Sequence, residues 1–152
     1  MKTRVLVDTN VLVYAYDRSE PSKQARALET LDALATSRRG VLTAQILSEF
    51  FVACTRKITV PLRVEEAYER IHNYLRSWEV VDVTGPIVLE AARGVREHHF
   101  SYWDSLIWAS ARLNQIPVIL SGNFNAGGVV EGVLFLNPFE EGFEIRTWIQ
   151  NL

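Results

Sequence analysis

The sequence lacks most of the residue patterns by which common enzyme classes are recognised. Its one cysteine, Cys54, cannot form an internal disulfide, and the apolar residues before it predict a buried thiol in a reducing compartment. The three histidines, His72, His98 and His99, do not have the spacing of zinc ligands. The sequence contains no Gly-x-x-x-x-Gly-Lys-Ser/Thr loop, no Gly-x-Gly-x-x-Gly turn and no Gly-x-Ser-x-Gly elbow. These absences leave zinc, nucleotide-cradling and serine-hydrolase chemistry without support.

The chain also lacks an excess of positive charge and a long apolar run. Its formal net charge is -2, so any binding of nucleic acid must come from a local basic patch or from a bound cation. The N-terminal apolar run is interrupted at Asp8, too early for a signal peptide, and no apolar stretch reaches the length of a membrane span. We therefore expect a cytoplasmic protein that does not contact a membrane.

Short apolar runs alternate with segments of helical pattern along the chain. The length of 152 residues, of which 48% are hydrophobic, favours one globular domain over residues 1–152. The predicted strands are residues 4–7, 40–42, 80–83, 117–120 and 133–136. The predicted helices are residues 22–36, 43–56, 61–77, 86–97 and 102–114. This alternation predicts a three-layer α/β/α sandwich with a central parallel sheet.

Three carboxylates are candidate functional groups, and each also has a structural explanation. Asp8 follows the first predicted strand, where open α/β sheets bind ligands, but it could equally cap a helix that begins near Asn10. Glu49 lies in the apolar helix TAQILSEFFVAC, on a stripe that could simply face water. Asp104 lies in the strongly apolar segment HHFSYWDSLIWASARL, where few acids are expected. Its spacing from Ser101 is that of a capping box, which would also account for it.

The three acids together predict a divalent metal site. Converging carboxylates repel one another and raise one another's pKa values unless a cation neutralises them. Mg²⁺ and Mn²⁺ prefer oxygen ligands, and such an ion acidifies a bound water and neutralises a phosphate. These are the requirements of phosphodiester hydrolysis.

Four segments carry these residues in a fixed order along nearly the whole chain. They are VDTNVLVYAYD (7–17), SEF around Glu49, SYWDSLIWASA (101–111) and PVILSGNFNAGGVVEGVLFLNPF (117–139). Together they resemble the PIN domain of VapC-type toxins, the ribonuclease half of VapBC toxin–antitoxin systems. The resemblance implies an endoribonuclease that uses Mg²⁺ or Mn²⁺ in an acidic pocket at the carboxyl edge of a parallel sheet. It implies that Asp8, Glu49 and Asp104 are catalytic, with Asp8 and Asp104 as metal ligands.

Three further polar residues follow from the resemblance, and one of them departs from its pattern. Asn10 and Ser121 match positions that hold the first carboxylate or a metal-bound water. Such toxins usually have Ser-Glu-Asp or Thr-x-Asp after the fourth strand, whereas this chain has Ser121-Gly122-Asn123. Because Asn123 offers one neutral oxygen, we expect it to hold a divalent ion less tightly than a carboxylate would. An asparagine after a strand is also an ordinary turn residue.

The resemblance also implies partners for the chain. They are an RNA substrate, a second copy in a homodimer and a VapB-type antitoxin whose tail covers the acidic pocket. Tyr102, Trp103 and Trp108 could stack on bases, but on so apolar a helix we expect them in the core or at a subunit interface. The basic residues that could lie along a phosphate path are mostly expected to be solvated: Arg38, Arg39, Arg56, Lys57, Arg93, Arg96 and Arg112.

Two other functions remain open from the sequence. The first is a PIN scaffold that has lost turnover and binds RNA or protein, which Asn123 motivates. The second is an unrelated flavodoxin-like or phosphotransfer domain in which Asp8 accepts a phosphoryl group. This second alternative leaves Glu49 and Asp104 without a role.

Overall fold

The centre of the fold is a mostly parallel sheet. The computed structural model describes residues 2–124 and 128–152, and within them the strand order is β3-β2-β1-β4-β6-β5. The strands are β1 (Val5–Val7), β2 (Gly40–Thr43), β3 (Glu79–Val81), β4 (Val118–Leu120), β5 (Val129–Val130) and β6 (Val133–Leu136). Neighbouring strands are parallel except β5 and β6, which form an antiparallel hairpin. The parallel sheet is as predicted, whereas β5 was not predicted.

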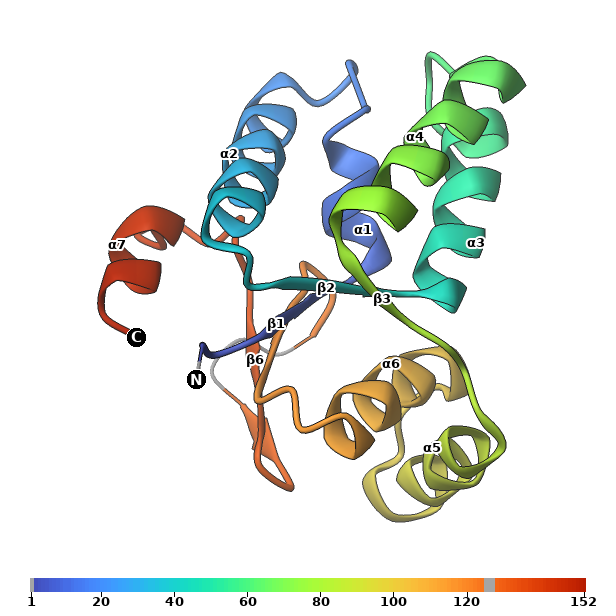
Figure 1. The fold of residues 1–152 in the computed structure, drawn as a ribbon, viewed down its shortest axis with the longest axis vertical. Coiled ribbons are helices and arrows are strands. Elements are labelled where there is room, and N and C mark those ends of the chain that lie inside the picture. The colour runs from blue at the N-terminus through green and yellow to red at the C-terminus, as the bar shows by residue number, and fades with distance from the viewer. Residues whose placement is uncertain (1, 125–127) are drawn as a thin grey trace.

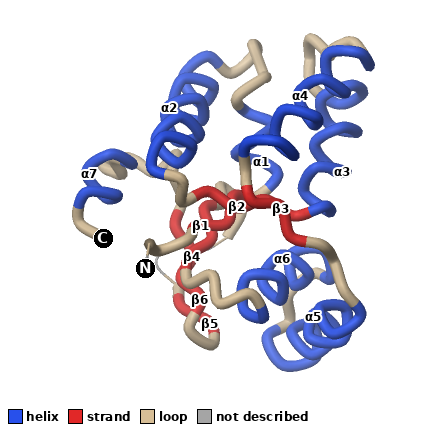
Figure 2. Tube along the Cα trace, viewed as in Figure 1, coloured by secondary structure: helices blue, strands red, loops and turns tan. Residues whose placement is uncertain are grey.

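Helices cover both faces of the sheet. They are α1 (Thr9–Tyr14), α2 (Pro21–Ser37), α3 (Ala44–Val52), α4 (Val64–Ser77), α5 (Gly85–His98), α6 (Tyr102–Leu113) and α7 (Ile145–Gln150). Figure 1 shows α1 to α4 on one side of the sheet and α5 and α6 on the other, with α7 beside α2. The strands in Figure 2 run between these two groups. The predicted three-layer α/β/α architecture is therefore confirmed.

The centre of the sheet and the α5–α6 pair are tightly packed. The three residues of β1, Val5–Val7, are fully buried, which explains why an uninterrupted apolar run forms the central strand. Trp108 of α6 is fully buried as well, as predicted. Gly94 of α5 allows this close approach, since a Cβ atom there would lie 2.8 Å from the Trp108 ring and would collide with the Ser105 hydroxyl.

Helix α3 continues directly into a π-helical turn, Ala53–Lys57. The sequence predicted a single helix over residues 43–56, so the α-helical part is shorter than expected. In the turn, the Ile58 backbone N–H donates to the Ala53 carbonyl at 3.1 Å, which closes a ring one residue longer than an α-helical ring. Side chains beyond such a ring are rotated back by about one residue, or roughly 100°. Cys54, inside the turn, is buried as predicted, and its burial raises the pKa of the thiol to about 12.

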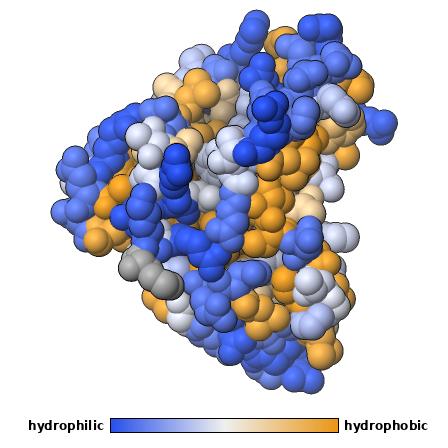
Figure 3. All heavy atoms as spheres, viewed as in Figure 1, coloured by the Kyte–Doolittle hydropathy of each residue, from blue (hydrophilic) through white to orange (hydrophobic). Residues whose placement is uncertain are grey.

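Hydrophilic and hydrophobic residues are separated on the face of the molecule that Figure 3 presents. Hydrophilic residues cover the outer sides of the helices, and hydrophobic residues gather between the α1–α4 group and the α5–α6 pair. None of the helices in the described part of the chain is long and apolar enough to span a bilayer.

Candidate active site

A cavity of about 720 Å³ lies where β1 and β4 end and where α1, α3 and α6 meet. All three predicted acids, Asp8, Glu49 and Asp104, line this cavity. Its other lining residues are Thr9, Asn10, Val13, Tyr14, Asp17, Ser48, Val52, Ala53, Lys57, Trp103, Ile107 and Asn123. The topology thus brings together carboxylates that are up to 96 positions apart in the sequence, from 8 to 104.

Asp8 both caps a helix and faces the cavity. It is the N-cap of α1, where its carboxylate accepts a hydrogen bond from the Thr9 backbone N–H at 2.7 Å. Only 4% of the residue is exposed. Burial raises the pKa of Asp8 to about 6, and the nearby charges of Asp104 and Glu49 add to this rise. Hydrogen bonds from Ser121 and Thr9 act in the opposite direction. The capping explanation of Asp8 is therefore confirmed, and the cap leaves the residue on the cavity wall.

Asn10 of α1 and Ser121, at the end of the neighbouring strand β4, hold the Asp8 carboxylate. The Ser121 hydroxyl donates to Asp8 Oδ2 at 2.7 Å, and Asn10 Nδ2 donates to the same oxygen at 3.2 Å. Asn10 Oδ1 accepts from the Gly122 backbone N–H at 2.9 Å, which ties the end of β4 to the start of α1. The Ser121 hydroxyl in turn accepts from the backbone N–H of Asn123 at 3.1 Å. These contacts fix the orientation of Asp8.

Glu49 is half-buried in the cavity wall and is not part of a stripe that simply faces water. The Thr9 hydroxyl donates to Glu49 Oε1 at 2.6 Å, and Gln45 Nε2 donates to Oε2 at 3.3 Å. Gln45 also donates to the Trp103 carbonyl at 3.2 Å, which connects α3 to α6. Sequence reasoning missed Thr9 and Gln45. Two signals could have found them: Thr9 follows Asp8 directly, and Gln45 lies four residues before Glu49, one helical turn away.

Asp104 lies in the first turn of α6, and only half of the predicted capping box forms. The Ser101 hydroxyl accepts from the Asp104 backbone N–H at 3.3 Å, so Ser101 is the cap. No donor in the described residues bonds to the Asp104 carboxylate, which is therefore available to a ligand in the cavity. The positive end of the helix dipole favours its charge.

The donor set fits a hard divalent cation. The three groups that donate to buried Asp8 are neutral, and within residues 2–124 and 128–152 none of the three acids forms an ion pair. A buried carboxylate without a cationic partner is costly, and a metal ion would offset that cost. Within the described residues, the one group of at least three His, Cys, Asp or Glu side chains whose ligand atoms all lie within 4.8 Å of one another does not include these three acids. The carboxylates of the cavity are spaced more widely than in that group, which suits Mg²⁺ because this ion commonly keeps several waters.

Asn123 and Asp17 complete the polar rim. Asn123 is exposed and lines the cavity at the position expected from the sequence. Asp17 is a fourth acid that the sequence did not suggest, and its Oδ1 already accepts two bonds from Ser19, at 3.0 and 2.6 Å. Residues 125–127 of the SGNFNAGG stretch lie outside the described residues.

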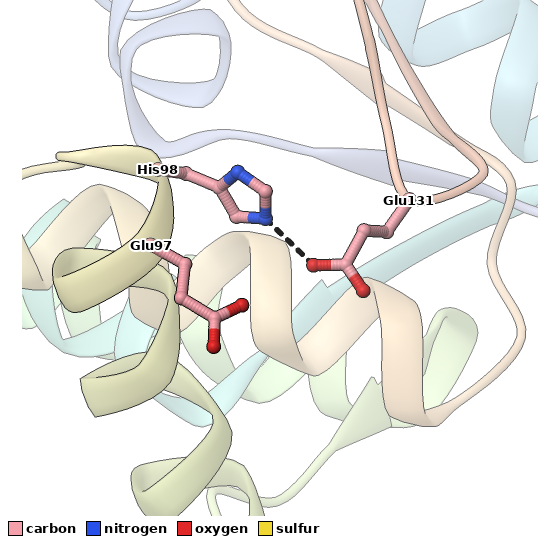
Figure 4. A group of neighbouring side chains, drawn as sticks. All are labelled: Glu97, His98 and Glu131. Carbon is pink, nitrogen blue, oxygen red and sulfur yellow. Dashed lines mark hydrogen bonds and ion pairs between the residues drawn. The ribbon is translucent and has the colours of Figure 1, made fainter.

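The group whose ligand atoms lie within 4.8 Å of one another is Glu97, His98 and Glu131, shown in Figure 4. His98 Nε2 lies 2.6 Å from a Glu131 oxygen, and the Arg93 guanidinium lies 2.9 Å from both oxygens of that carboxylate. Arg93 also pairs with Glu97 at 2.6 Å. The bond from Arg93 and then that from His98 lower the pKa of Glu131 to about 2. Cations of the protein already neutralise this cluster, so it ties α5 to the β5–β6 turn and is poorly suited to a metal ion.

Comparison with known proteins identifies the family. Residues 5–126 match the family model of the PIN domain. The chain belongs to the PIN domain family. This membership replaces the flavodoxin-like alternative and confirms the family suggested by the sequence. No curated protein sequence gives a significant match to this PIN chain.

Solved structures share the fold at low sequence identity. A toxin–antitoxin complex from Klebsiella pneumoniae has a TM-score of 0.66 at 18% identity, covering 90% of this chain and 98% of that one. VapBC2 from Rickettsia felis, bound to a DNA fragment of its promoter, has a TM-score of 0.62 at 15% identity and covers 88% and 97%. VapC20 from Mycobacterium tuberculosis, a toxin that cleaves the sarcin–ricin loop, has a TM-score of 0.58 at 18% identity and covers 84% and 97%.

Proposed function

We propose that this PIN chain is a divalent-metal-dependent endoribonuclease and the toxin of a VapBC-type pair. The observation that carries the proposal is the placement of Asp8, Glu49 and Asp104 around one cavity at the carboxyl edge of the sheet. Family membership and the fold shared with VapC toxins support the same function. The cavity size falls in the range of ligand-binding pockets, about 300–1,000 Å³.

The three acids have two tasks in this proposal. Asp8 and Asp104 bind Mg²⁺ or Mn²⁺, because Asp8 is buried without a cation and the Asp104 carboxylate has no described donor. Glu49, held by Thr9 and Gln45, orients the attacking water by accepting a hydrogen bond from it. The bound ion supplies an acidified water and neutralises the scissile phosphate. Asn10 and Ser121 keep Asp8 in place.

The proposed partners are an RNA substrate, a second copy of the chain and a VapB-type antitoxin. The toxin–antitoxin complexes among the structural neighbours motivate the antitoxin. In such a complex, we expect a tail of the antitoxin to cover the acidic cavity. Light scattering at micromolar concentration tests the homodimer, and a monomer would contradict it.

Asn123 favours a second candidate, a PIN scaffold with weakened or lost turnover that binds RNA or protein. The exposed amide of Asn123 on the cavity rim adds no charge to the site. An ion held by fewer carboxylates is bound less tightly. This candidate predicts RNA binding without cleavage at any metal concentration.

A metal-titrated cleavage assay on mixed single-stranded RNA separates the two functions. We expect Mn²⁺ or Mg²⁺ to activate cleavage, and Asp8→Asn and Asp104→Asn each to abolish it. Asp82→Asn is the matched control, since Asp82 is an exposed aspartate that does not line the cavity. Absence of cleavage by the unaltered protein at saturating metal would contradict the endoribonuclease.

A further inference from the structure

Lys57 lines the cavity from the end of the π-helical turn. In an uninterrupted α-helix, Arg56 lies seven residues, almost two full turns, beyond Glu49 and would share its stripe. In the structure Lys57 lines the cavity and Arg56 does not. Both cations are exposed, and no hydrogen bond or ion pair to either side chain occurs within the described residues.

Trp103 also lines the cavity and directly precedes Asp104 in the sequence. The sequence suggested core packing or an interface for this residue, but 62% of it is exposed, so core packing is wrong. Tyr102 contacts the indole edge-on, with the ring centroids 5.2 Å apart and the planes at 75°. Gln45 holds the Trp103 carbonyl, which fixes the backbone beneath the ring. A large exposed aromatic side chain on a fixed backbone is a surface on which a flat ligand can stack.

We propose that Lys57 and Trp103 form a subsite for single-stranded RNA in the cavity of the acidic site. The Lys57 ammonium binds a backbone phosphate, and the indole of Trp103 stacks on an unpaired base. The proposal rests on the proposed function and deepens it by naming two residues outside the acidic group that position the RNA. Neither residue takes part in the chemical step; both position the substrate.

The composition of the cavity favours an unpaired strand over a duplex. Bases within a duplex are stacked on one another and do not present their faces to a side chain. An exposed indole beside a free ammonium combines the two elements by which proteins bind single strands. The net charge of the chain is -2, so a local cation such as Lys57 has to offset the repulsion between phosphates and the acids of the cavity.

Equilibrium binding of a fluorescein-labelled, unstructured single-stranded RNA tests the subsite in EDTA, without metal or turnover. We expect Trp103→Ala to weaken binding about thirtyfold, which corresponds to the middle of the range for stacking on one base. Trp103→Phe should restore most of the affinity. Tyr68→Ala is the matched control, because Tyr68 is 61% exposed but lies outside the cavity.

The dependence of RNA affinity on salt concentration tests the proposed phosphate contact of Lys57. Lys57→Ala should lower the slope of log affinity against log salt by about 0.7, the value for one contact with a single strand. Lys57→Arg should keep the slope. Arg56→Ala should change neither affinity nor slope, since Arg56 lies on the same turn but outside the cavity.

The outcomes separate this proposal from the proposed function. If the unaltered protein binds RNA through Lys57 and Trp103 but no metal restores cleavage, the subsite stands and the endoribonuclease fails. If metal-dependent cleavage occurs while both alanine variants keep the parental affinity and KM, the subsite is wrong and the exposed indole serves a protein contact. Equal losses in the Arg56 and Tyr68 controls, or equal sensitivity of duplex RNA to Trp103→Ala, would also overturn it.

Discussion

Replacing Asp8 with asparagine should stabilise the metal-free protein at neutral pH. Burial raises the pKa of Asp8 from 3.8 to about 6, a shift of about two units. At about 1.4 kcal/mol per unit, keeping this carboxylate ionised in the folded state costs about 3 kcal/mol at pH 7. Asparagine has no such cost and remains a good N-cap. It weakens the hydrogen bond from Ser121, which offsets about 1 kcal/mol. The net gain expected at pH 7 is about 2 kcal/mol.

The gain should depend on pH in a defined direction. Because the folded-state pKa of Asp8 lies above its unfolded value, the native state binds more protons between pH 3.8 and about 6. The contribution of Asp8 to stability is therefore present below this window and is lost as pH rises through it. The advantage of Asp8→Asn should be large above pH 6 and should disappear below about pH 4.

Urea unfolding in EDTA across this pH range measures the difference between the two proteins. Asp82→Asn, at an exposed site, controls for a change of one formal charge and should leave the difference near zero. A loss of more than about 1 kcal/mol in Asp8→Asn at pH 7 would mean that capping by the ionised carboxylate outweighs the cost of its burial, and would refute this reasoning.

Three further substitutions test other parts of the structure. Asn123→Asp should tighten Mn²⁺ binding in calorimetric titration about tenfold, or roughly 1.4 kcal/mol, and an unchanged affinity would mean that this side chain does not face the ion. Ser121→Ala removes a hydrogen bond that lowers the pKa of Asp8, so Mn²⁺ binding should weaken more below about pH 6 than above it, and equal weakening at all pH values would contradict this. Gly94→Ala should lower the free energy of unfolding by about 1–3 kcal/mol through collision with Ser105, and an unchanged urea midpoint would contradict the close packing of α5 on α6.

The sequence predicted the fold well where its patterns are long. The apolar run before Asp8 forms the buried central strand β1, and the strongly apolar segment around Trp108 forms the buried helix α6. The strand β5 and the helix α7 were not predicted, because two and six residues are too few to carry a periodic pattern. The sheet was predicted to be parallel, whereas β5 pairs with β6 in the antiparallel direction.

The sequence predicted those site residues whose place follows directly from the position of a strand or helix. Asp8 could be expected at the cavity because the ends of parallel strands meet at one edge of a sheet. The place of Lys57 could not, because the helical spacing from Glu49 favours the neighbouring cation Arg56 instead. The exposure of Trp103 likewise depends on how α6 meets α3, which its apolar neighbours in the sequence do not reveal.

The most direct test of the metal site is the anomalous scattering of Mn²⁺ in crystals of the chain. We predict one strong peak in the acidic cavity, with carboxylate oxygens of Asp8 and Asp104 among the ligands at about 2.0–2.6 Å, the range for oxygen ligands of hard divalent ions. Asp8→Asn crystals grown and soaked alongside should lack the peak. Manganese bound instead at Glu97, His98 and Glu131, or a cavity without manganese at saturating concentration, would contradict the assignment of the active site.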